Sequence, residues 1–127
     1  MFKKIFLFFY ENWKIYTSLI FIIITFLSLY PLKEQPSIPG SDKIHHLIAY
    51  SALAIGVGLR RPSNYVLIII FFSFYSGLIE LIQPYVNRFR EIEDFLFNNL
   101  GIFIGLSLGI SINKIFNKYF FDNNSQS

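Results

Sequence analysis

Polar and ionisable side chains recur at helical spacing in three separate parts of an otherwise apolar sequence. Residues three, four or seven positions apart lie on one face of a helix. Three sets of residues meet this condition: Asp42, His46 and Tyr50; Glu80 and Gln83; Asp94, Asn98 and Gly101. Their carboxylates, imidazole and amides could bind a polar ligand, hold a divalent cation or transfer protons, provided that the fold brings the three faces together.

Glu80 and His46 are the candidates for acid–base chemistry. A carboxylate in hydrocarbon is disfavoured by a few kcal/mol at the bilayer centre and usually faces the bundle interior with a partner. Glu80 is therefore either functional or structural, in the second case through a hydrogen bond to Gln83 or an ion pair with Arg88. His46 changes charge near neutral pH and could act as a general base or a metal ligand; the alternative is a satisfied interfacial histidine. His45 points about 100° away on the same helix and is treated as peripheral.

The remaining charged residues suggest how a ligand or cation could be held. The planar guanidinium group of Arg88 could clamp a phosphate or carboxylate. The alternative for Arg88 and Arg90 is pairing with the acids that follow: Glu91, Glu93 and Asp94. A divalent cation could be held by oxygen and nitrogen ligands from Asp42, His46, Glu80 and Asp94. No compact metal motif such as H-E-x-x-H accompanies them, the chain has no cysteine, and no other cofactor is expected.

The composition predicts that these residues sit on membrane helices. Only 15% of the 127 residues are charged, against roughly a quarter in soluble domains. Four stretches contain no Asp, Glu, Lys or Arg: 15–32, 44–59, 62–79 and 95–113. A soluble four-helix bundle would need a polar face on every helix, which the run V-L-I-I-I-F-F-S-F at 66–74 does not provide. We therefore predict one all-α, polytopic membrane domain over 1–127, with four transmembrane helices at about 15–31, 44–60, 63–83 and 95–116.

Basic residues near the predicted helix ends indicate the orientation. One side carries seven: Lys3, Lys4, Lys14, Arg60, Arg61, Lys114 and Lys118. The other carries four: Lys33, Lys43, Arg88 and Arg90. Because Lys and Arg are enriched on the cytoplasmic side, both termini should be cytoplasmic and the three polar faces extracytoplasmic. The basic, aromatic segment 2–14 should lie at the membrane surface.

A run of glycines predicts where one helix is approached closely. Gly101, Gly105 and Gly109 fall every fourth residue, a spacing that leaves a groove for another helix backbone. We expect this face to pack against another helix of the same chain. The alternative is an interface through which two copies form an oligomer.

Three motifs in series resemble those of the VanZ-like family. They are D-K-x-x-H-x-x-x-Y at 42–50, G-x-x-E-x-x-Q at 77–83 and R-x-x-x-x-x-D-x-x-x-N-x-x-G at 88–101. The sequence departs from the family at P-Y-V-N (84–87), where a Pro-Gly-type turn is common, and Asn87 could serve as the turn residue. VanZ-like proteins are small bacterial integral membrane proteins, and the namesake is associated with resistance to the lipoglycopeptide teicoplanin. The resemblance implies a multi-pass protein of the bacterial inner membrane and a link to antibiotic resistance.

Three functional hypotheses follow. In the first, an outer-leaflet site binds an envelope-derived lipid, a cell-wall precursor or a lipoglycopeptide; beside His46 and Glu80, its ligand-binding residues are Asp42, Lys43, Tyr50, Gln83, Arg88, Asp94 and Asn98. In the second, the protein is an intramembrane enzyme with His46 or Glu80 as acid or base and with Asp42 and Asp94 positioning a cation. The third is a small proton-coupled exporter that uses Glu80. The expected partner is the lipid bilayer, and no nucleic acid is expected.

Overall fold

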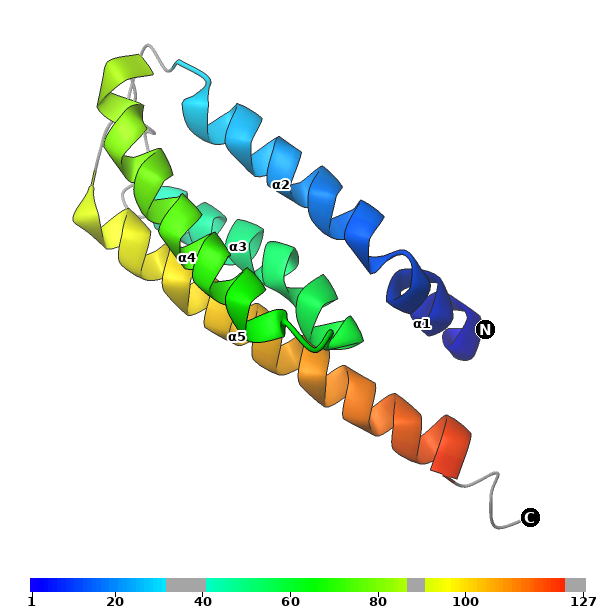
Figure 1. Cartoon of the computed structure of the whole chain (residues 1–127). Helices are drawn as coiled ribbons and strands as arrows, with labels where there is room; N and C mark the ends of the chain where they lie inside the picture. The colour runs from blue at the N-terminus through cyan, green and yellow to red at the C-terminus, as the bar shows by residue number, and fades with distance from the viewer. Residues whose placement is uncertain (32–40, 87–90, 123–127) are drawn as a thin grey trace.

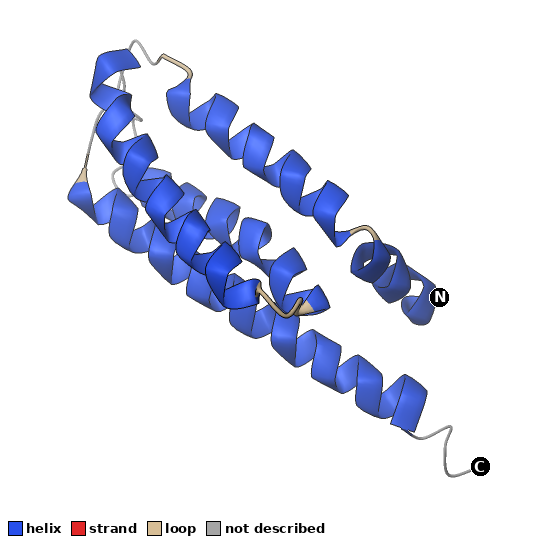
Figure 2. Cartoon of the chain, in the orientation of Figure 1, coloured by secondary structure: helices blue, strands red, loops and turns tan. Residues whose placement is uncertain are grey.

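The computed structural model describes residues 1–31, 41–86 and 91–122, and every regular element within them is helical (Figure 2). The α-helices are α1 (Phe2–Glu11), α2 (Trp13–Leu29), α3 (Ser41–Arg60), α4 (Tyr65–Ile82) and α5 (Ile92–Asn117). A short 3-10 turn, Gln83–Val86, extends α4, and a π-helical turn, Lys118–Asp122, extends α5. The all-helical fold class is confirmed. Helices α2 to α5 occupy the four stretches in which the sequence predicted spans.

Length and apolarity identify the helices that can cross a membrane. The segments Tyr65–Val86 and Ile92–Asp122 qualify, and the pair Phe2–Glu11 and Trp13–Leu29 qualifies if it forms one bent span. Among the described residues, two or three helices therefore meet the requirement, which is consistent with a multi-pass membrane protein. Large apolar side chains such as Leu67, Phe74 and Phe103 are well exposed. Such an outer surface suits lipid better than water.

Helix α3 contributes the largest share of the buried apolar residues. Tyr50, Leu53, Ala54 and Val57 on α3 are almost completely buried, and they form the core together with Ile24, Phe72 and Ile102 from the other helices. The opposite face is partly open, since Ile44 and Ile48 are more than half exposed. The charged residues of α3, Asp42 and Arg60, lie in its first and last turns, where the ends of a membrane helix meet water.

The glycine face of α5 packs on α3 within the chain. A Cβ atom on Gly101 would lie 2.5 Å from the carbonyl oxygen of Leu47, and one on Gly105 would lie 2.8 Å from Ser51 Cα. Gly109 makes an equally close approach to the backbone of α3. This is the packing that the sequence analysis favoured for these glycines. An oligomer stays a prediction, and it would need another surface while α3 covers this one.

The first helix turns away from the second; that it lies at the membrane surface stays a prediction. Helices α1 and α2 are bent by 70° at the break between them. Phe6 is the buried residue of α1, and its ring stacks on that of Phe116 at a centroid distance of 4.2 Å. Because Phe116 lies near the end of α5, helix α1 and the C-terminal part of α5 share one end of the bundle (Figure 1). The starts of α3 and α5 lie at the opposite end.

Helix α5 begins earlier than the sequence suggested. We expected Asp94 to cap a helix that starts at residue 95, but the helix starts at Ile92 with Glu91 in the N-cap position. Asp94 and Glu93 lie in the first turn, where a negative charge interacts favourably with the helix dipole. The side chain of Asp94 is thereby turned toward α3 instead of back onto its own helix.

Candidate functional site

His46 lies between two residues of α5. Its Nδ1 atom is 2.9 Å from Asn98 Oδ1, and its Nε2 atom is 3.8 Å from Asp94 Oδ2. Asp94 and Asn98 are four residues apart, so one face of α5 presents both to α3. Asn98 is 0% exposed and Asp94 is 4% exposed. With Asn98 Oδ1 as acceptor, Nδ1 donates; an imidazolium would also direct a second N–H toward the carboxylate of Asp94.

Lys43 is engaged by the acids at the start of α5. Its ammonium group donates a hydrogen bond to Glu93 and lies 3.7 Å from Glu91 Oε2. In this structure, Lys43 therefore links the first turns of α3 and α5. A ligand that binds Lys43 would have to compete with Glu93.

Tyr50 and Gln83 are buried deeper in the bundle. Tyr50 is 1% exposed, and its hydroxyl group has no hydrogen-bond partner among the described residues. Gln83 donates from Nε2 to the carbonyl oxygen of Ser28, at 3.2 Å, and so ties the end of α4 to the end of α2. Sequence reasoning missed this contact, because the acceptor is a main-chain carbonyl oxygen that a residue of any type would supply.

Glu80 is buried, and it lines a different cleft from His46. A cleft of about 590 Å³ lies between α4 and α5 and is lined by Glu80, Ser73, Gly77, Phe95 and further apolar residues. His46 instead lines a cleft between α2 and α3. The structure therefore separates the two residues that the sequence grouped as acid–base candidates. Arg88, predicted to bind a ligand, and Arg90 lie outside the described residues.

The α2–α3 cleft has a volume of about 430 Å³, a polar end and an apolar wall. Asp42, His45 and His46 lie toward the start of α3, and Tyr50 lies one turn beyond His46. The apolar part of the lining is formed by Ile20, Ile23, Ile24, Leu27, Ile48, Ala49 and Ala52. His45, which the sequence analysis set aside, thus contributes to the lining. The wall contributed by α2 was also missed, because its side chains are indistinguishable in sequence from lipid-facing ones.

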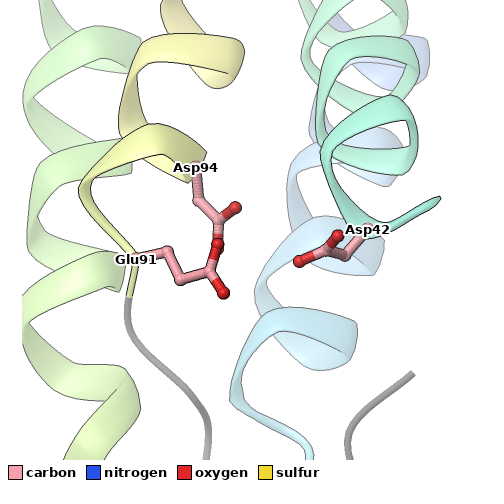
Figure 3. A group of neighbouring side chains, drawn as sticks. All are labelled: Asp42, Glu91 and Asp94. Atoms are coloured by element: carbon pink, nitrogen blue, oxygen red, sulfur yellow. The ribbon is translucent and has the colours of Figure 1, made fainter. Parts of the chain in front are cut away.

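Three carboxylates meet where α3 and α5 begin. One oxygen atom from each of Asp42, Glu91 and Asp94 lies within 4.8 Å of the others (Figure 3). The predicted cation ligands were Asp42, His46, Glu80 and Asp94. In the described part of the chain, Asp42 and Asp94 lie close together, and His46 lies beside Asp94. Glu91 joins this group although it was not predicted. Glu80 lines the other cleft.

The chain was also compared with known proteins. No protein-family model matches it, and neither a curated protein nor a solved structure matches it.

Proposed function

We propose that the protein is a four-span membrane protein that binds one amphiphilic molecule of the cell envelope at the extracytoplasmic surface. The observation that carries this proposal is the α2–α3 cleft. Its charged end matches a polar head group, and its wall of isoleucine and leucine matches an acyl or polyprenyl chain. A site that is polar at one end and apolar along its length fits an amphiphile better than a fully polar solute.

His46 and Asp42 give the cleft its polar contacts near the start of α3, where they would meet the head group. Tyr50 lies one turn beyond His46 and also lines the cleft. Its hydroxyl group is fully buried, so the contact that Tyr50 offers to a ligand is apolar.

The topology in this proposal makes α3 the fourth span. Its 20 residues extend over about 30 Å, the thickness of the hydrocarbon core, and an even number of spans puts both termini on one side. The close contact of α1 with the end of α5 supports that arrangement. The count of basic residues then assigns the termini to the cytoplasm. We also propose membership of the VanZ-like family, on the three motifs, and location in the bacterial inner membrane.

Ligand-dependent stabilisation in detergent tests the binding proposal. The purified protein would be melted with phosphatidylglycerol, with undecaprenyl phosphate and with teicoplanin, which represent a lipid, a cell-wall carrier and a lipoglycopeptide. We expect at least one to raise the melting temperature of the wild type. Ile48→Trp narrows the cleft from a residue that is 60% exposed, and Leu67→Trp, on α4 and 68% exposed, is its matched control. Stabilisation should disappear in Ile48→Trp and persist in Leu67→Trp; its absence from the wild type in all three arms would contradict the proposal.

An intramembrane enzyme is the second candidate, and the surroundings of His46 favour it. Asn98 orients the imidazole ring, and the carboxylate of Asp94 lies at its other nitrogen, the arrangement that a general base needs. Because Glu80 lines the other cleft, His46 would act without it. In this case, the His46→Gln variant would fold but would no longer convert a component of lipid extracts. The Glu80→Gln variant would still convert that component. Unchanged extracts with the wild type would count against this candidate.

A further inference from the structure

The carboxylates of Asp42, Glu91 and Asp94 converge from the first turns of two helices. Figure 3 shows those of Glu91 and Asp94 directed into the gap between α5 and α3, which Asp42 enters from the other side. One oxygen atom from each lies within 4.8 Å of the other two. Three negative charges at this separation repel one another, which favours either protonation or a bound cation.

Asp94 gives independent evidence for a ligand. Its side chain is only 6% exposed. The Oδ1 atom is fully buried and accepts no hydrogen bond from the described residues. The other oxygen, Oδ2, lies 3.8 Å from His46 Nε2, beyond hydrogen-bond distance. A buried carboxylate oxygen without a donor is costly, and coordination to a metal ion would satisfy it.

The nearest lysine does not fully balance this group. Lys43 donates its hydrogen bond to Glu93, which is not one of the three converging carboxylates, and lies at the longer distance of 3.7 Å from Glu91. Glu93 is therefore a useful internal comparison. It is an acid of the same turn, it has a lysine partner, and it is not one of the three carboxylates that converge.

We propose that Asp42, Glu91 and Asp94 form a calcium site. Carboxylate oxygens select hard cations such as Ca²⁺ and Mg²⁺. Ca²⁺ accepts about six to eight oxygen ligands in a flexible geometry, whereas Mg²⁺ requires a near-ideal octahedron at about 2.1 Å. Three carboxylates that converge from two helices therefore suit Ca²⁺ better than Mg²⁺. Small side-chain movements would bring their oxygens to one ion, and water would complete the coordination. This site stands whether or not the α2–α3 cleft binds an amphiphile.

Calcium titration of the purified full-length protein tests the proposal. Isothermal titration calorimetry should give one Ca²⁺ per chain, with a dissociation constant of about 10⁻⁴–10⁻³ M, as in extracellular modules with few ligands. Asp94→Asn should weaken binding about tenfold or more, and the less buried Asp42→Asn should do the same if the first variant fails to fold. Glu93→Gln should leave the affinity unchanged.

A melting comparison separates a calcium site from a purely structural ion-pair cluster. Without Ca²⁺, in EGTA, Asp94→Asn should melt at a higher temperature than the wild type, because the amide removes the repulsion. In saturating Ca²⁺ the order should reverse. The proposal is overturned if about 10 mM Ca²⁺ neither binds to nor stabilises the wild type, or if Glu93→Gln loses as much affinity as Asp94→Asn. It is also overturned if Asp94→Asn melts below the wild type in EGTA, as loss of a pair with His46 would require.

Discussion

Gly105→Ala should be the most damaging single-methyl addition among the glycines of α5. The new Cβ atom would lie 2.8 Å from both the carbonyl carbon and Cα of Ser51, and closer still to its carbonyl oxygen. Carbon atoms prefer separations of about 3.5–4.0 Å, so α3 and α5 would have to move apart by about 1 Å at this point. Both sides of the contact are backbone, and no rotamer change relieves it.

We expect a loss of about 3 kcal/mol in the free energy of unfolding, the upper end of the usual range for overpacking. Gly77→Ala is the matched control, because its Cβ would meet only the Phe95 ring, at 3.4 Å and 3.8 Å. It should be neutral or stabilising, since alanine exceeds glycine in helix propensity by about 1 kcal/mol. Unfolding by SDS in mixed micelles, followed by the fluorescence of Trp13, the single tryptophan, measures both. The reasoning is refuted if Gly105→Ala unfolds at the wild-type midpoint, or if Gly77→Ala is equally destabilising.

Three further predictions concern polar contacts and topology. Asn98→Leu should cost about 1–3 kcal/mol in the same SDS assay, because His46 Nδ1 loses its partner at a buried position; wild-type stability would show that the contact is dispensable. Tyr16→Phe removes the 2.9 Å hydrogen bond from the tyrosine hydroxyl to the Ala52 carbonyl oxygen and should cost about 0.5–1.5 kcal/mol, whereas no change would mean that water replaces it. A reporter that is active only outside the cytoplasm should be inactive when fused after Ser127, and activity there would reverse the proposed orientation.

Periodicity and composition were sufficient to predict the helices and to place some of the polar residues on a shared face. The spacing of Asp94 and Asn98 placed both on one face, and the structure brings that face to His46. Helix α5 nevertheless starts at Ile92, with Glu91 in the N-cap position and Asp94 inside the first turn. Boundaries of this kind depend on a few backbone angles that the apolar pattern does not encode.

The sequence could not predict which cleft each residue lines, because this depends on the orientation of each helix about its own axis. Glu80 and His46 were grouped as one site because both were predicted near the same end of the bundle. In the structure, His46 lines the α2–α3 cleft and Glu80 lines the α4–α5 cleft. The lining contributed by Ile23 and Leu27 of α2 was equally hidden. An isoleucine that faces a cleft and one that faces lipid obey the same spacing rule, and only packing distinguishes them.

Native mass spectrometry of the protein extracted in mild detergent would test the central claim most directly, namely that the α2–α3 cleft holds one amphiphile. The account predicts that the wild type carries a single bound molecule with an apolar chain, that Ile48→Trp is released without it, and that Leu67→Trp retains it. A wild-type chain that carries no such molecule, or an Ile48→Trp variant that carries the same one, would contradict the account.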